Sequence, residues 1–287
     1  MNFDYPDLPI LDSHIHLDPA GNPETAVRRF TAEGGTHLIV IHKPYDDLPI
    51  STLEDYRRAF NRTLLMARKA EGWGVKSWAV LGPYPVELME LSKRMGLEEA
   101  RKLQMSSVDL ALEMVENGEA LGLGEIGRIH FPVSNEIQNC CDEILLYALR
   151  GCKDLNCPAI LHTESLDENG ELMDHLASIA DRAGIDRKRV IKHYSNGGMC
   201  DPMINLGLSV SVLSHSRNLR SALETGNDFL LETDYIDSPD RPNVVLPPDM
   251  VPKKIKWAYR ASILDEKKHS RLMIDHPKRV LGIETDP

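Results

Sequence analysis

The sequence predicts an α/β protein of the (β/α)₈ TIM-barrel class, in a single domain that spans residues 1–287. Eight short apolar runs occur along the chain, and amphipathic helical patterns separate them. This alternation is typical of repeated βα units and a parallel sheet, and eight such units can close a barrel with the helices outside. Length alone would suggest two domains, but α/β barrels of this size fold as one.

The apolar runs define the predicted strands, which cover residues 8–17, 37–42, 75–82, 120–127, 159–164, 189–194, 208–215 and 229–234. Clear helical patterns lie between them at residues 23–34, 53–72 and 136–152. The connection after the third strand carries two helical patterns, at 86–96 and 97–118, where one would suffice. We therefore expect an extra helix on the third βα unit rather than a second domain.

Proline is dense in residues 236–252, directly after the last predicted strand. A loop in this place would lie at the C-terminal rim of the barrel, where barrel enzymes bind their substrates.

Composition narrows the class of protein. With 42% hydrophobic and 27% charged residues, the chain suits a globular domain, and no apolar run approaches the ~18 residues needed to cross a bilayer. The net charge of −11, without a basic stripe, argues against an extended nucleic-acid-binding surface. The N-terminus lacks the pattern of a signal peptide, and the five cysteines form no CxxC pair. We expect a cytoplasmic protein, whose oligomeric state the sequence leaves open.

Six side chains of metal-ligand type fall at or near the C-terminal ends of five predicted strands: His14, His16, Glu125, His162, His193 and Asp234. In a barrel these strand ends converge on one mouth. His14 and His16 are two residues apart, so both imidazoles lie on the same face of a strand. The sequence thus predicts a metal site at the mouth.

Any one of these residues alone has an ordinary explanation, because a single histidine in an apolar strand is usually a hydrogen-bonded core residue. Their shared position favours a metal site over six unrelated core residues, since six buried polar side chains would each need a separate partner. Nitrogen and oxygen ligands without thiolate suit Zn²⁺, Mn²⁺ or Mg²⁺. We expect one or two divalent ions per chain, with zinc favoured because imidazoles dominate.

The sequence resembles the TatD-related branch of the amidohydrolase superfamily, whose members are metal-dependent hydrolases on a (β/α)₈ barrel. The similar segments are LDSHIHLD, LGLGEIG, ILHTE, VIKHYSNGG and LLETDY, in the order of the family and over essentially the whole barrel. The resemblance implies that His14, His16, Glu125 and Asp234 hold one metal. It also implies that Glu125, His162 and His193 hold a second, with Glu125 bridging the two.

The sequence departs from the pattern of DNA-cleaving members after the fourth and fifth strands, where it reads GEIGRIHFP and HTES. Glu164 stands where a basic group is expected, and its charge would disfavour a polyanion near the mouth. The candidate substrate contacts at strand ends are His42, Lys43, Arg128, Glu164 and His215.

Asp234 is the candidate general base, because it could touch both a metal and the attacking water. Glu125 is a second candidate catalytic residue, because it would bridge the two metals. Glu232 could orient a ligand imidazole by contacting the ring on the side away from the metal. Three functions remain open: hydrolysis of a phosphodiester, hydrolysis of an amide, lactone or carboxylic ester, and a non-catalytic metal-binding scaffold. The expected substrate is a small molecule or a short nucleic acid.

Overall fold

The computed structural model describes residues 6–165, 170–238 and 244–286. Within these ranges the chain forms nine strands: β1 (Leu11–His16), β2 (His37–Ile41), β3 (Lys76–Leu81), β4 (Gly122–Gly127), β5 (Ala159–His162), β6 (Val190–Ser195), β7 (Ser209–Leu213), β8 (Leu230–Glu232) and β9 (Tyr235–Ile236). They form one parallel sheet in the order β8-β7-β6-β5-β4-β3-β2-β1-β9. All eight predicted strands are present.

The sheet closes on itself because its two edge strands are consecutive in the chain. Only Thr233 and Asp234 separate β8 from β9, and β9 pairs with β1 in the register Ile15 to Tyr235. The Asp234 amide donates to the His14 carbonyl oxygen over 3.0 Å. Asp234 has a φ of 49°, which interrupts the extended backbone and divides the eighth barrel strand in two. The predicted barrel is confirmed, with this break as an addition.

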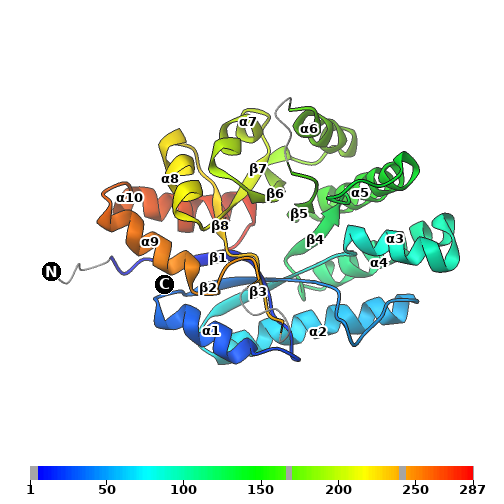
Figure 1. Cartoon of the computed structure of the whole chain (residues 1–287), viewed down its shortest axis with the longest axis horizontal. Helices are drawn as coiled ribbons and strands as arrows, with labels where there is room; N and C mark the ends of the chain where they lie inside the picture. Colours follow the sequence, from blue (N-terminus) through cyan, green and yellow to red (C-terminus); the bar gives the residue numbers. More distant parts are fainter. Residues whose placement is uncertain (1–5, 166–169, 239–243, 287) are drawn as a thin grey trace.

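Helices surround the strands on all sides (Figure 1). They are α1 (Pro23–Ala32), α2 (Leu53–Gly72), α3 (Pro85–Met95), α4 (Leu97–Glu116), α5 (Asn135–Leu155), α6 (Glu171–Ala183), α7 (Cys200–Asn205), α8 (Ser216–Thr225), α9 (Met250–Arg260), α10 (Glu266–Ser270) and α11 (His276–Val280). Short 3₁₀ turns precede β6 and α7, and a π-helical turn (Arg271–Asp275) joins α10 to α11. The core helices lie between successive strands, as the sequence pattern predicts.

The extra helix on the third unit is present as the pair α3 and α4. Pro85 opens α3, where its missing amide hydrogen costs nothing, and Gly96 separates the two helices with a φ of 84°. The preceding helix α2 begins with a capping box between Thr52 and Asp55. These local signals fix where the chain turns back toward the sheet.

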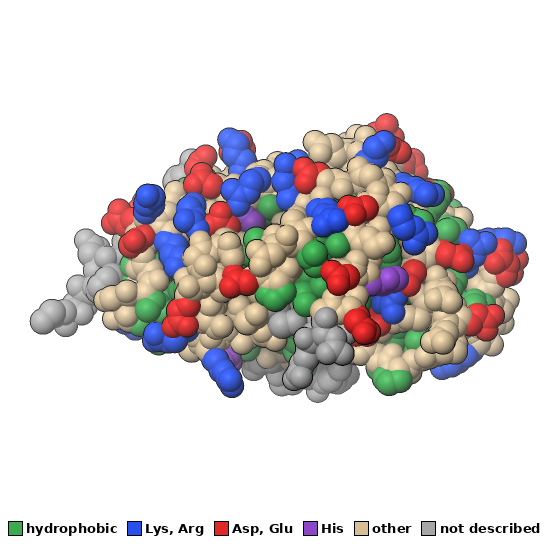
Figure 2. All heavy atoms as spheres, turned by 90° about the horizontal axis from the view of Figure 1, so that it is seen from above, with side chains coloured by type: hydrophobic (Ala, Val, Ile, Leu, Met, Phe, Trp, Pro, Cys, Tyr) green, Lys and Arg blue, Asp and Glu red, His purple; other side chains and the backbone are tan. Residues whose placement is uncertain are grey.

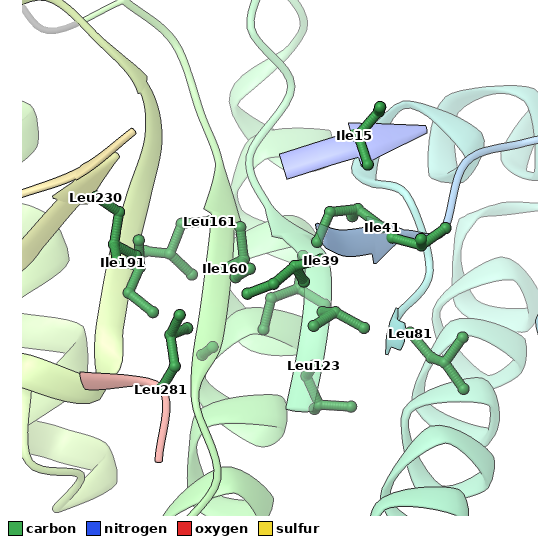
Figure 3. Packing of buried hydrophobic residues seen from close by; sticks show 14 of the residues in the cluster. Ile15, Ile39, Ile41, Leu81, Leu123, Ile160, Leu161, Ile191, Leu230 and Leu281 are labelled. Atoms are coloured by element: carbon green, nitrogen blue, oxygen red, sulfur yellow. The ribbon is translucent and has the colours of Figure 1, made fainter. Parts of the chain in front are cut away.

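Buried aliphatic side chains of the strands form much of the hydrophobic core. Ile39 and Ile41 of β2, Ile160 of β5 and Ile191 of β6, all labelled in Figure 3, are at most 2% exposed. Phe30 of α1 is fully buried as well. This packing holds the strand ends in fixed positions.

None of the described helices is long and apolar enough to cross a membrane. On the face shown in Figure 2, acidic and basic side chains are interspersed rather than gathered by sign.

The predicted rim loop after the last strand is present in part. Ile236 makes an antiparallel bridge to Val244, and helix α9 begins at Met250. Residues 239–243 of the predicted loop lie outside the described residues.

Candidate metal centre

The first strand brings two imidazoles to the mouth of the barrel. All six residues of β1 are buried, and the two-residue spacing of His14 and His16 puts both rings on the same face. Their Nε2 atoms lie only 3.2 Å apart. Asp12 fastens this strand to the eighth, since its carboxylate accepts hydrogen bonds from the amides of His14 and Thr233 and from the Thr233 hydroxyl. Burial raises the pKa of Asp12 to about 7.

Glu125 on β4 divides its two carboxylate oxygens between two groups of histidines. Oε1 lies 3.0 Å from His14 Nε2 and 3.2 Å from His16 Nε2. Oε2 lies 2.7 Å from His162 Nδ1 and 3.5 Å from His193 Nε2. The side chain is 4% exposed. One carboxylate therefore joins two clusters of ligand-type atoms.

Asp234 completes the first cluster. Its Oδ1 lies 3.3 Å from His16 Nε2 and 3.6 Å from His14 Nε2. The ligand-type atoms form two groups, and within each group all the atoms lie within 4.8 Å of one another. The first group comprises His14, His16, Glu125 and Asp234, and the second comprises Glu125, His162 and His193.

The charges of the clustered side chains favour a cation at the centre of the cluster. Burial lowers the pKa of His16, but hydrogen bonds to Asp234 and Glu125 outweigh burial and raise it to about 10. Burial likewise raises the pKa of Glu125, yet the surrounding histidines hold it well below its usual range. Two buried carboxylates facing four imidazoles thus fit a divalent cation, which would meet the ligand atoms that now face one another.

Glu232 lies behind two of these rings. Its Oε2 is 3.9 Å from His14 Nδ1 and its Oε1 is 3.8 Å from His193 Nδ1, while Oε1 accepts the Tyr194 amide hydrogen over 2.5 Å. The His14 and His193 rings stack with their centroids 4.3 Å apart. Burial raises the pKa of Glu232 to about 6. This placement suits a carboxylate that orients both imidazoles.

A cavity of about 270 Å³ opens on the cluster. Its walls are His16, His42, Lys43, Pro44, Asp46, Tyr84, Glu125, His162, His193, Asp234, Ile236 and Ser238. A larger cavity of about 770 Å³ lies at the opposite end of the barrel, next to Ser77, Pro158 and Arg189. It contacts none of the six predicted ligands.

Two of the five predicted substrate contacts line the cavity. His42 is 1% exposed, its Nδ1 contacts the Thr63 hydroxyl over 3.0 Å, and its Nε2 has no hydrogen-bond partner among the described residues. Burial lowers the pKa of His42 to about 3, so the ring is neutral. Lys43 Nζ lies 2.6 Å from Asp18 Oδ2, which compensates its charge.

The other three predicted contacts do not line this cavity. Arg128 Nη2 lies 3.0 Å from Glu164 Oε1, and its Nη1 lies 2.5 Å from Asp142 Oδ1. Arg128 and Glu164 thus neutralise each other in a neighbouring depression that includes His175. His215 is exposed at the start of α8.

Sequence reasoning missed Tyr84, and it noted His130 as a departure from the family pattern without giving it a role. The Tyr84 hydroxyl is 3.4 Å from His162 Nε2, and His130 Nδ1 is 2.8 Å from the same atom. Tyr84 follows the third strand, so the rule that found the other residues, polar groups just after a strand, could have found it. Gly82 and Pro83 separate Tyr84 from the end of the strand, so Tyr84 falls beyond the apolar run and the signal was hidden.

Comparison with known proteins agrees with this geometry. The family model described as TatD related DNase matches residues 11–282. An uncharacterized protein of Methanocaldococcus jannaschii, MJ1127, is 30% identical over 97% of this chain and 98% of its own length.

Solved structures share the fold at low identity. The TatD-like protein AF1765 from Archaeoglobus fulgidus has a TM-score of 0.65 at 17% identity, covering 95% of this chain and 100% of its own. The TatD homolog YJJV from Escherichia coli K12 has a TM-score of 0.65 at 18% identity, covering 96% of this chain and 98% of its own. The Escherichia coli phosphotriesterase homology protein has a TM-score of 0.61 at 14% identity, covering 97% and 100%.

The match of the family model over nearly the whole barrel decides the assignment. The chain belongs to the TatD related DNase family of metal-dependent hydrolases.

Proposed function

We propose that the chain hydrolyses phosphodiester bonds with one or two divalent cations, in a small-molecule or short nucleic-acid substrate. The observation that carries the proposal is the division of the Glu125 carboxylate between two clusters of ligand-type atoms. A pair of cation positions bridged by one carboxylate suits the in-line displacement at phosphorus. The description of the family supports the same bond type.

The six predicted ligands fall into two sets in this proposal. His14, His16, Asp234 and Glu125 Oε1 would hold one cation, and Glu125 Oε2, His162 and His193 the other. When bound, such cations activate water as a nucleophile and withdraw electron density from the ester. Zinc is favoured because four of the six ligands are imidazoles, although manganese or magnesium would also accept this set.

Asp234 is the general base of the proposed reaction. Its side chain lines the cavity, and its Oδ1 faces the first cluster, so the other oxygen is available to an attacking water. Transfer of the water proton to a carboxylate in this position would assist attack on phosphorus. Glu232 would hold His14 and His193 in the orientation that ligation requires.

The cavity supports a small or short substrate. Its 270 Å³ lies just below the usual range for small-molecule sites, roughly 300–1,000 Å³. Lys43 is paired with Asp18, and the net charge of the chain is −11. A long duplex, which is bound through many phosphate contacts, would find few partners here.

The first test is metal content. Protein purified without chelator should carry one to two divalent ions per chain, with zinc predominant. The His16→Ala variant should lose the ion of the first cluster. The variant His215→Ala, which changes an exposed histidine outside the cavity, should lose none. Full occupancy in His16→Ala would remove His16 from the ligand set.

The second test is bond type. Wild type should hydrolyse bis(4-nitrophenyl) phosphate and a short single-stranded oligonucleotide, and a chelator should abolish both activities. A panel of 4-nitrophenyl acetate, amides and lactones serves as comparison. Chelator-sensitive turnover of the panel without any phosphodiester cleavage would overturn the proposal in favour of acyl chemistry.

A further inference from the structure

Tyr84 occupies a rigid position at the wall of the cavity. It lies between Pro83 and Pro85, and proline on both sides restricts the backbone. Its carbonyl oxygen accepts hydrogen bonds from Gln104 Nε2 over 3.3 Å and from the Glu87 amide over 3.0 Å. The backbone of this residue is therefore fixed from two helices, so its side chain is held where it lines the cavity.

The Tyr84 ring packs edge-on against His162, with centroids 4.9 Å apart and an interplanar angle of 69°. His162 turns Nδ1 toward Glu125, at 2.7 Å, so Nδ1 is the atom that it offers to the cluster. With a cation bound at Nδ1, Nε2 would carry the hydrogen and would donate it to His130 Nδ1, which lies 2.8 Å away.

This arrangement leaves the hydroxyl hydrogen of Tyr84 without an acceptor. Among the described residues, His162 Nε2 is the one hydrogen-bond neighbour of Tyr84 Oη, and a protonated Nε2 cannot accept. Tyr84 lines the cavity, so its hydroxyl would then be free to donate to a molecule within it.

Tyr84 and Asp234 lie on different sides of Glu125. Asp234 contacts the cluster that faces Oε1, whereas Tyr84 contacts His162 in the cluster that faces Oε2. In an in-line displacement the attacking and leaving oxygens lie on opposite sides of phosphorus. We infer that Tyr84 is a further catalytic residue, whose hydroxyl donates a hydrogen bond to the leaving-group oxygen. This inference rests on the proposed function.

The step balances as follows. The water oxygen forms a bond to phosphorus and gives one proton to Asp234, and the bond from phosphorus to the leaving oxygen breaks with its electron pair on that oxygen. Tyr84 stabilises the developing charge by its hydrogen bond and keeps its own proton. Asp234 then releases its proton to solvent, and the departing alkoxide or phenoxide takes up one proton from solvent to become the free alcohol or phenol.

The test uses leaving groups of different basicity on the same diester. Methyl 4-nitrophenyl phosphate and methyl phenyl phosphate differ in how much charge the leaving oxygen must carry. For Tyr84→Phe we expect kcat to fall by less than about fivefold with the nitrophenyl ester and on the order of 10²-fold with the phenyl ester, since one donor to a developing oxyanion has this effect. Metal content should stay at the wild-type level.

Tyr45→Phe is the matched control. Tyr45, like Tyr84, follows a strand end, but its hydroxyl contacts Thr63 over 2.9 Å and it does not line the cavity. In this variant kcat should fall by the same small factor with both substrates.

The outcomes separate the inference from the proposed function. An equal loss on both diesters in Tyr84→Phe, or loss of metal from that variant, overturns the role of Tyr84 alone. If wild type cleaves only 4-nitrophenyl acetate and phenyl acetate, the phosphodiester proposal fails and the same comparison on these two esters decides about Tyr84. If wild type cleaves neither class, both proposals are overturned.

Discussion

Two residues at the mouth of the barrel hold left-handed backbone conformations that are unusual for side chains of their size. Tyr194, directly after His193, has a φ of 56°, and Asp234 has a φ of 49°. Such a conformation costs on the order of 1 kcal/mol or more in a residue other than glycine. At Tyr194 it accompanies an amide that donates to Glu232, and at Asp234 an amide that donates to the His14 carbonyl. In both cases the strained backbone anchors part of the cluster.

The residue-scale prediction concerns Asp234. Asp234→Asn keeps the shape of the side chain and one oxygen that faces His16, but it removes the carboxylate that accepts the proton. We expect hydrolysis to fall by ~10² or more while most of the metal stays bound. Steady-state kinetics and metal analysis on the same preparation would check this. An unchanged rate would show that another group takes the proton.

At the scale of the elements, the end of β4 is pressed against the end of β5. Gly127, the last residue of β4, has a φ of 132°, and a Cβ at this position would lie 2.3 Å from the His162 carbonyl oxygen. The next amide, of Arg128, donates to that same oxygen over 2.8 Å. Only glycine permits the approach that fixes His162 beside Glu125.

Gly127→Ala should therefore displace the end of β5 and lower both stability and metal content. Gly74→Ala is the matched control, because Gly74 has a similar φ of 106° but no atom within 4 Å of its Cβ position. We expect Gly74→Ala to lose about 1–2 kcal/mol of unfolding free energy from backbone strain and to keep its metal. Denaturant titration and metal analysis of both variants would show whether Gly127→Ala loses more unfolding free energy and more metal than Gly74→Ala. Equal behaviour would contradict the packing argument.

At the scale of the whole molecule, acid stability should depend on groups remote from the metal cluster. His276 is 4% exposed and lines a small cavity beside Ser209, the first residue of β7, and its Nδ1 accepts from Arg279 over 2.7 Å. Burial and the charge of Arg279 lower the pKa of His276 to about 4, from the ordinary histidine value of 6.5. The unfolded chain thus binds this proton more tightly than the folded one. The stabilisation is present above pH 6.5 and is lost as the pH falls toward 4.

His276→Asn should make the protein less sensitive to acid. The asparagine oxygen can still accept from Arg279, but it does not titrate. Between pH 7 and 4.5 the free energy of unfolding of wild type should fall on the order of 2 kcal/mol more than that of the variant. Denaturant titrations at the two pH values would measure the difference. An equal fall in unfolding free energy in both proteins would show that His276 does not contribute to the acid sensitivity.

The sequence by itself determined the strand pattern, the extra helix and the six ligand-type residues. These features depend on local periodicity, since alternation places His14 and His16 on one face, and barrel topology brings all strand ends to one mouth. The tertiary structure decided which charged groups meet. It paired Arg128 with Glu164, brought Tyr84 to His162, and turned the two oxygens of Glu125 toward different clusters. Such pairings join residues tens of positions apart, and they depend on side-chain directions and distances of a few ångströms that no local pattern encodes.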